Sequence, residues 1–221
     1  MIKIKNRHVI IAGVAAVLAA TSNNVHGQDA AQDAKLHAAM SASAYASFSA
    51  AIKDAKARGL PAEPLVAKGI EGAAKNVPGD RIVIAVRATA DRMGRAQLLL
   101  RSSRPTTSAE IVAVADALQR NVPEDALRKL SADAAGRATI AVTSYALADL
   151  MASGVPLAVG VEVIGAWRAG GGDAAMLKEV PATIERLMRQ GVAPARAGAG
   201  VAAGLKLGTP LSRLTPVNLP R

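Results

Sequence analysis

Few residues of this chain have side chains that could carry out catalytic chemistry. Cysteine is absent, which excludes thiol nucleophiles and thiolate metal ligands. Only one histidine, His37, lies beyond residue 27, too few for a multi-histidine metal site or a supported Ser-His-Asp triad. The adjacent carboxylates Glu124 and Asp125 follow a proline, as acids in the first turn of a helix often do. We therefore expect no enzyme, metal or cofactor, although acid–base chemistry by carboxylates alone stays open.

Glu162 is a weak candidate for a buried carboxylate. It is the one polar residue between Leu157 and Trp167, in a segment that is apolar on nearly all sides and is therefore expected to lie centrally. A carboxylate buried there would need a partner or a raised pKa. The alternative is a structural glutamate that reaches the edge of the bundle or pairs with an arginine.

The densest positive region lies between Arg81 and Arg104, where six arginines accompany a single acid, Asp91. Arginine faces of this kind contact phosphate, carboxylate polymers or lipid headgroups. An ordinary solvated helix face would explain the same charges. The candidate anion contacts are Arg81, Arg92 and Arg95, on the side of a predicted helix opposite the apolar stripe Ile82, Val86, Met93 and Leu100.

The glycine-rich stretches do not form nucleotide sites. Gly198–Gly204 has the outline G-x-G-x-x-x-G but follows no predicted strand, and Gly170–Gly172 lacks the Gly-Lys-Ser/Thr ending of a phosphate loop. The four-residue spacing of Gly200, Gly204 and Gly208 suits close helix approach. Nucleic acid is not an expected partner, because four aromatic residues provide no stacking platform.

The hydrophobic pattern that must position these residues is helical nearly throughout. Of the 221 residues, 51% are hydrophobic and 2% aromatic, and strand-like alternation is scarce. We expect an all-α fold, an irregular bundle or a stack of antiparallel helical hairpins rather than a regular superhelix. Helices are predicted at Ala34–Arg58, Ala62–Lys75, Gly79–Arg101, Ser108–Arg120, Glu124–Ala135, Ala138–Ser153, Leu157–Ala169, Asp173–Gln190 and Ala195–Lys206.

One turn is repeated five times between these helices. Gly or Asn supplies a residue that tolerates the left-handed conformation, a short aliphatic folds back onto the finished helix, and Pro begins the next one. The uneven spacing of the turns argues against a fixed repeat, and both chance reuse and internal duplication stay open. The turns are Gly59-Leu60-Pro61, Asn76-Val77-Pro78, Asn121-Val122-Pro123, Gly154-Val155-Pro156 and Gly191-Val192-Ala193-Pro194.

Residues 1–27 are predicted to be a signal peptide. Basic residues precede twelve apolar or small residues, Val9–Ala20, and we expect cleavage between Gly27 and Gln28. An uncleaved anchor is the alternative, but twelve residues fall short of the about 20 that span a bilayer. Cleavage would remove three basic residues and no acid, lowering the net charge from +10 to +7. The expected location is periplasmic or secreted, in a bacterium.

The remaining chain is predicted to be a single all-α domain over residues 28–206, of which 28–42 is a candidate disordered segment. Residues 207–221 contain Pro210, Pro216 and Pro220 and are expected to form an extended, Pro-rich tail. No stretch after the signal segment is long and apolar enough to span a membrane.

Residues 59–86 resemble a group of exported bacterial helical proteins that have no assigned activity. The resemblance is carried by Gly59-Leu60-Pro61, Pro64-Leu65, Lys68, Glu71-Gly72, Ala74-Lys75, Val77-Pro78, Arg81-Ile82 and Ala85-Val86, with a looser likeness in the later turns. Asn76 stands where the group is expected to have Gly. The resemblance implies an exported helical protein and nothing about a substrate.

These observations favour a non-enzymatic exported protein that acts through protein contacts, as a scaffold, a chaperone-like protein or an assembly factor. Its partner would be a protein of the cell envelope. The alternative is an electrostatic binder of anionic envelope polymers or lipid surfaces, through the arginine-rich helix face.

Overall fold

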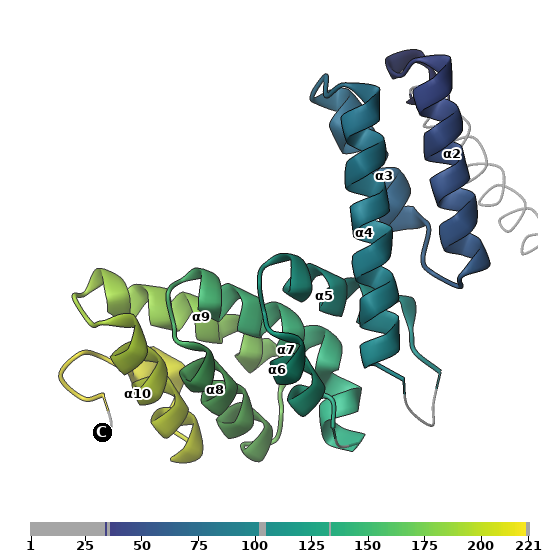
Figure 1. The fold of residues 1–221 in the computed structure, drawn as a ribbon. Helices are drawn as coiled ribbons and strands as arrows, with labels where there is room; N and C mark the ends of the chain where they lie inside the picture. Colours follow the sequence, from purple (N-terminus) through teal and green to yellow (C-terminus); the bar gives the residue numbers. More distant parts are fainter. Residues whose placement is uncertain (1–33, 35, 102–104, 133, 220–221) are drawn as a thin grey trace, which may run out of the picture. The chain divides into compact units, whose positions relative to one another are not determined.

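A computed structural model describes residues 34, 36–101, 105–132 and 134–219. The predicted signal peptide, its cleavage position and residues 28–33 of the candidate disordered segment lie outside the described residues. The described chain is helical and contains no strand, which confirms the predicted all-α class (Figure 1). Its helices are α2 (Ala42–Ala57), α3 (Glu63–Ala74), α4 (Gly79–Leu99), α5 (Ser108–Gln119), α6 (Glu124–Leu130), α7 (Ala134–Ala152), α8 (Leu157–Ala169), α9 (Ala174–Arg189), α10 (Pro194–Lys206) and the short 3-10 helix η1 (Leu211–Arg213).

Three helix boundaries differ clearly from the sequence prediction, and one of them is the start of α7, at Ala134 rather than at Ala138. The expected helix over 34–58 is interrupted at residues 40 and 41, where the hydroxyl of Ser41 accepts the N–H of Ala44 and caps α2. The predicted helix Glu124–Ala135 ends early at Leu130, and Ser131 is its C-cap residue, with an N–H shared between the carbonyls of Leu127 and Arg128. None of the described helices is long and apolar enough to cross a membrane.

The repeated turn has one backbone geometry. Its Gly or Asn takes a positive φ, from 53° at Asn76 to 88° at Gly191. The N–H of the following residue bonds to the carbonyl five residues earlier, the Schellman pattern that satisfies a helix's last carbonyls. The five bonds are Leu60 to Ala55 at 2.9 Å, Val77 to Gly72 at 3.0 Å, Val122 to Ala117 at 2.9 Å, Val155 to Leu150 at 3.0 Å and Val192 to Leu187 at 3.1 Å.

The aliphatic residue of each turn folds back as expected. Leu60, Val122 and Val155 are buried, whereas Val77 and Val192 are half-buried. The prolines lie at different positions relative to the next helix. The proline at 194 is the first residue of α10, Pro123 and Pro156 are N-cap residues, and Pro61 precedes the N-cap residue of α3.

The structure contains two more turns of this kind that the sequence analysis did not include. Gly171 has φ +102° and precedes the bond from the N–H of Gly172 to the carbonyl of Trp167. Gly208 has φ +66°, and the N–H of Thr209 bonds to the carbonyl of Gly204 at 2.8 Å. Both turns lack the aliphatic residue after the left-handed glycine, so the repeated sequence pattern did not include them.

The contacts divide the chain into two compact units, where the sequence analysis expects one domain. Unit 1 consists of the described residues up to Asp54 together with Ala62–Arg87. Unit 2 consists of Ala55–Pro61 together with the described residues from Ala88 onward. In unit 1, helices pack closely through glycines of α3. A Cβ at Gly69 would lie 2.6 Å from the ring of Phe48, and one at Gly72 would lie 2.7 Å from Ile82.

Unit 2 arranges most of its helices in two rows. Helices α5, α7 and α9 pack side by side in one row, and α8 packs along α10 in the other (Figure 1). Consecutive helices connect the rows, because α6 packs on α7, α7 on α8 and α9 on α10. The guanidinium of Arg168 on α8 donates to the carbonyl of Leu130 at the end of α6, at 2.8 Å. The expected hairpin stack is therefore present in this unit.

The segment after Leu207, expected to be extended, folds back instead. It contains η1 and a hydrogen-bonded turn between Thr215 and Asn218. Leu211, Leu214 and Leu219 are buried. Burial of these leucines stabilises the folded-back conformation of the segment relative to the extended one.

The turn geometry predicts opposite effects for the same substitution at two glycines. Gly154→Ala places a Cβ in the left-handed region and should lower the free energy of unfolding by about 1–2 kcal/mol. Gly165→Ala, on the exposed side of α8 with no atom within 4 Å of the added Cβ, should raise it by about 0.5–1 kcal/mol. Urea unfolding followed by the fluorescence of Trp167, the single tryptophan, measures both. Equal effects at the two positions would contradict the turn assignment.

Candidate functional site

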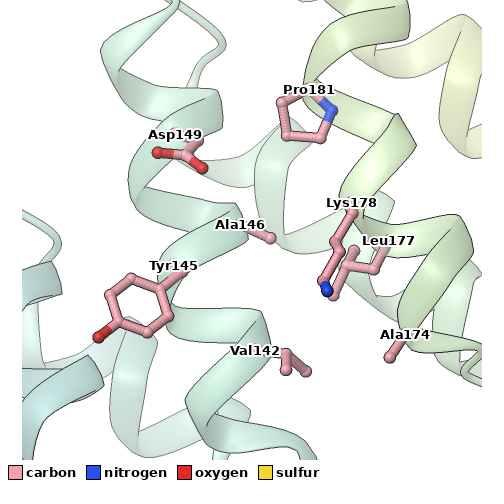
Figure 2. A pocket seen from close by; sticks show the side chains of 8 residues that line it. All are labelled: Val142, Tyr145, Ala146, Asp149, Ala174, Leu177, Lys178 and Pro181. Carbon is pink, nitrogen blue, oxygen red and sulfur yellow. The ribbon is translucent and has the colours of Figure 1, made fainter.

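The candidate site is a groove between α7 and α9 of unit 2 (Figure 2). Its cavity volume is about 210 Å³. The two helices are neighbours in one row but are separated in sequence by α8, so the fold alone brings their faces together. The lining residues are Val142, Tyr145, Ala146 and Asp149 on α7 and Ala174, Leu177, Lys178 and Pro181 on α9.

Each helix contributes one stripe to the groove. The lining positions on both helices follow the spacing i, i+3, i+4, i+7, which places four side chains on one helix face. Leu177 and Ala146 are buried and form an apolar base. Val142 and Tyr145 are 37% and 41% exposed, so large apolar surface remains open to solvent beside that base.

The negative charge in the groove is already offset. Arg120, the C-cap residue of α5, donates to Asp149 at 2.6 Å and lies 3.7 Å from the carboxylate of Asp116. This arginine therefore joins α5 to α7 and neutralises the acid that lines the groove.

Lys178 carries the uncompensated charge of the groove. Within the described part of the chain it forms no ion pair, and its side chain extends along the groove wall in Figure 2. A positive charge beside apolar surface attracts a ligand that combines an apolar group with an acid.

Tyr145 keeps its proton. Burial raises the pKa of its phenol above the ordinary 10.0, and the negative charge of Asp116 raises it further. The hydroxyl therefore stays a hydrogen-bond donor at physiological pH. It has no hydrogen-bond partner among the described residues, which leaves it available to a ligand.

Pro181 adds a backbone acceptor to the wall. It lies inside α9 and has no N–H, so the carbonyl of Leu177 lacks the donor that a helix normally supplies four residues later. Because Leu177 also lines the groove, this carbonyl is a polar group close to the apolar base.

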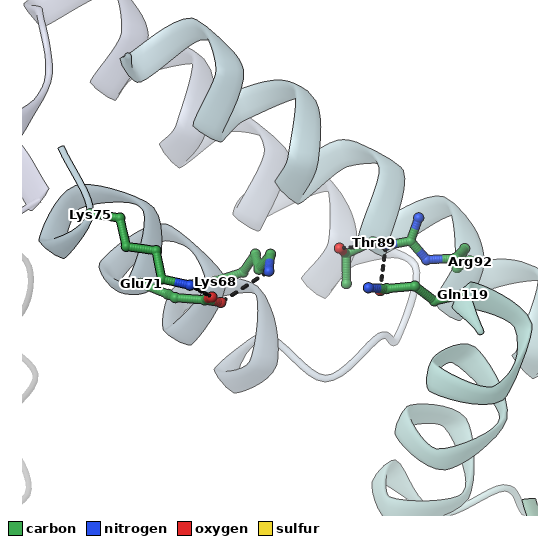
Figure 3. Close-up of polar contacts among 6 residues, drawn as sticks. All are labelled: Lys68, Glu71, Lys75, Thr89, Arg92 and Gln119. Atoms are coloured by element: carbon green, nitrogen blue, oxygen red, sulfur yellow. Dashed lines mark hydrogen bonds and ion pairs between the residues drawn. The ribbon is translucent and has the colours of Figure 1, made fainter. Parts of the chain in front are cut away.

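The arginines expected to contact anions are partly engaged within the protein. Arg92 donates to Gln119 at 2.9 Å and to Thr89 at 3.0 Å (Figure 3), and Arg95 lies 3.7 Å from the carboxylate of Glu124. Arg81 is exposed and belongs to unit 1, whereas the other two belong to unit 2. The apolar stripe predicted opposite them is confirmed: Ile82, Val86, Met93 and Leu100 are all buried.

The expectation of a buried carboxylate at Glu162 is wrong. Its side chain is 51% exposed and accepts a hydrogen bond from Lys206 of α10 at 2.7 Å. Helix α8 buries the face that carries Val163, Ile164 and Trp167, so Glu162 falls at the outer edge. This is the structural role held as the alternative, with a lysine in place of the arginine.

The most perturbed carboxylate belongs to Glu71 in unit 1. Hydrogen bonds from Lys75 and from Lys68, the latter at 2.9 Å, together with the charges of both lysines, lower the pKa of Glu71 from 4.5 to about 2 (Figure 3). These three residues occupy one side of α3 at helical spacing, and all are at least 39% exposed. They form a surface ion cluster.

In the described ranges, no three His, Asp or Glu side chains are close enough together to hold an ion. His37 stacks edge-on against Tyr45, with 4.7 Å between ring centroids. The sequence analysis did not identify the groove. The spacing of Val142, Tyr145 and Asp149 was visible in the sequence, but its pairing with α9 was not.

The shift at Glu71 predicts a pH-dependent contribution to the stability of unit 1. Because the pKa is lower in the folded state, the contribution is present above about pH 4.5 and is lost as the pH falls toward about 2. NMR titration of the Glu71 carboxylate at low salt should give the low value, and Lys75→Met should raise it. High salt should reduce the difference, since the cluster is exposed. A Glu71 carboxylate that titrates near 4.5 at low salt would contradict the cluster, and Lys53→Met is a control that should have no effect.

Searches of protein-family models, curated proteins and solved structures find no match for this chain.

Proposed function

We propose that this chain is an exported, non-enzymatic interaction protein whose α7/α9 groove binds an extended peptide segment of a partner protein. Its role would be that of a scaffold, a chaperone-like protein or an assembly factor. The observation that supports this proposal is the pairing of two apolar stripes from neighbouring helices, with Val142 and Tyr145 left open to solvent.

The groove chemistry favours a particular kind of segment. The apolar base formed by Ala146 and Leu177 suits an aliphatic side chain. Lys178 and the hydroxyl of Tyr145 are donors that suit a carboxylate on the same segment. The net charge of +7 that the chain would keep after removal of residues 1–27 favours an acidic partner over a basic one. The occupant is therefore a peptide with an apolar residue next to an acidic one.

The polar groups around the groove support the proposal of binding. Arg120 bridges two carboxylates, and this fixes their position and offsets their charge. Tyr145 has a raised pKa and therefore acts as a donor, not as a base. A rigid aromatic with a free hydroxyl beside an apolar pocket is typical of a protein contact surface.

A second candidate is binding of anionic polymers or lipid surfaces. It is favoured by the exposure of Arg81 and of Arg95, whose side chain is 58% exposed. The contacts of Arg92 with Gln119 and of Arg95 with Glu124 count against it, because an incoming anion must compete with them.

Peptides selected from a displayed library on the immobilised full chain provide the test of the groove. We expect enrichment of segments that place an apolar residue beside an acid. Tyr145→Ser and Lys178→Glu should each weaken binding about tenfold or more, since contacts at the centre of an interface carry most of its free energy. Fluorescence anisotropy with the selected peptide measures the affinity.

Glu162→Gln is the matched control, because that residue is exposed on α8 and does not line the groove. It should leave the affinity unchanged. Peptides that bind the wild type and both groove variants equally well would contradict the proposed site.

Retention on heparin and on vesicles of anionic lipid tests the second candidate. If the arginine face binds polyanions, replacing Arg81, Arg92 and Arg95 by Gln should lower the salt concentration needed for elution. Replacing Arg189, Arg196 and Arg213, which lie elsewhere on the chain, removes the same charge. Equal losses in the two triple variants would show a response to net charge alone and would exclude a specific arginine face.

A further inference from the structure

Helix α10 is in contact with other parts of unit 2 on two nearly opposite sides. Gly198 faces α8, where a Cβ would lie 2.7 Å from Val159 and 3.1 Å from Val155. Gly200 and Gly204 lie about 200° and about 240° around the helix from Gly198, at 100° per residue. The C-terminal segment covers that second side.

The leucines of this segment fit the glycines of α10. A Cβ at Gly204 would lie 3.0 Å from Leu214, and one at Gly200 would overlap the side chain of Leu219. Both leucines are buried, and so is Leu211. The small residues on α10 are therefore the space that these side chains fill.

The backbone of the segment is held as well. Arg186 of α9 donates to the carbonyl of Leu211 at 3.0 Å and to that of Leu214 at 2.9 Å. Asn218 closes the turn that follows, because its side-chain amide donates to the carbonyl of Arg213 at 2.7 Å and its oxygen accepts the N–H of Thr215 at 2.6 Å.

The segment therefore takes the place of a further layer of the stack. Its 3-10 helix η1 packs on α9 and on α10, as the next hairpin would if the two rows continued. It covers an apolar, glycine-lined face that would otherwise be the open end of unit 2.

We propose that residues 209–219 form an exchangeable end cap, and that the α10 face it covers binds the same segment of a second copy of this chain. A second copy is the partner that fits, because its segment carries the same three leucines and the same carbonyls for Arg186. In an isolated chain the cap binds its own α10, since its attachment gives it a high effective concentration. This inference does not depend on the α7/α9 groove.

Gly208 is the hinge residue, whose backbone conformation would change when the segment is exchanged. Its φ of +66° directs the chain back onto α10, and no atom lies within 4 Å of the position of a Cβ. A side chain there would strain the folded-back path without touching the cap or the α10 face. A strained hinge favours exchange of the segment between copies.

A mixing experiment with two full-length variants tests the proposal. The first, Leu214→Ser with Leu219→Ser, has a defective cap and an intact α10 face. The second, Gly200→Glu with Gly204→Glu, has an intact cap and a blocked face. Each variant alone should be a monomer by light scattering, and an equimolar mixture should form a one-to-one complex. Circular dichroism checks that each variant keeps its helices.

A mixture that shows no complex would overturn the proposal. Association of the cap-defective variant with itself would also overturn it, because α10 would then bind something other than the cap. As a control, Val217→Ser takes the place of the cap-defective variant in the mixture. Val217 lies in the cap and is 97% exposed, so this variant should keep its α10 face covered and give no complex.

The hinge gives a second test that leaves the leucines and glycines intact. Gly208→Val should lower the dissociation constant of the dimer by about tenfold or more, because strain in the closed monomer is released on exchange. Gly191→Val is the matched control, with a φ of +88° and equally open space, and should destabilise the fold without producing a dimer. Equal behaviour of the two variants would overturn the hinge role.

Discussion

The hydrogen bond that closes most of the described helices is the interaction on which the rest of this structure depends. A left-handed Gly or Asn lets the N–H of the next residue reach a carbonyl five residues back. That bond satisfies groups that a helix end otherwise leaves to water. It also turns the following aliphatic residue inward, where Leu60, Val122 and Val155 are buried. Since so few residues separate the helices, the next one must begin close to the end of the last.

In unit 2, repetition of this turn places alternate helices side by side in rows. Helix α7 thus packs on α9, although α8 separates them in the sequence, and α8 packs on α10, although α9 separates them in the sequence. The groove is a consequence of that alternation, because the faces of α7 and α9 are adjacent only in the row. Arg120 adds a polar connection along the same row, from the end of α5 to Asp149 on α7.

Small residues decide how closely the elements approach. Gly198 admits Val159 of α8 on one side of α10, and Gly204 admits Leu214 of the C-terminal segment on the other. A larger residue at either position would keep the neighbouring element from its present place. Gly200 and Gly204, two of the three glycines that the sequence suggested for close helix approach, thus accommodate a folded-back tail, whereas Gly208 has no atom within 4 Å of the position of a Cβ. That tail leaves the apolar end of the unit covered rather than open to solvent.

The sequence by itself determined the helices, the turns and the buried stripe of α4, because these depend on φ preferences and on neighbours within a few residues. Even Pro181 and the spacing of Val142 to Asp149 were visible there. Only the tertiary structure decided which faces meet. Glu162 is exposed because α8 packs through its opposite face, and its partner Lys206 lies far along the chain. The tail folds back because α10 presents a glycine seam. Contacts between distant residues follow from the packing of whole helices, which a pattern of neighbours does not encode.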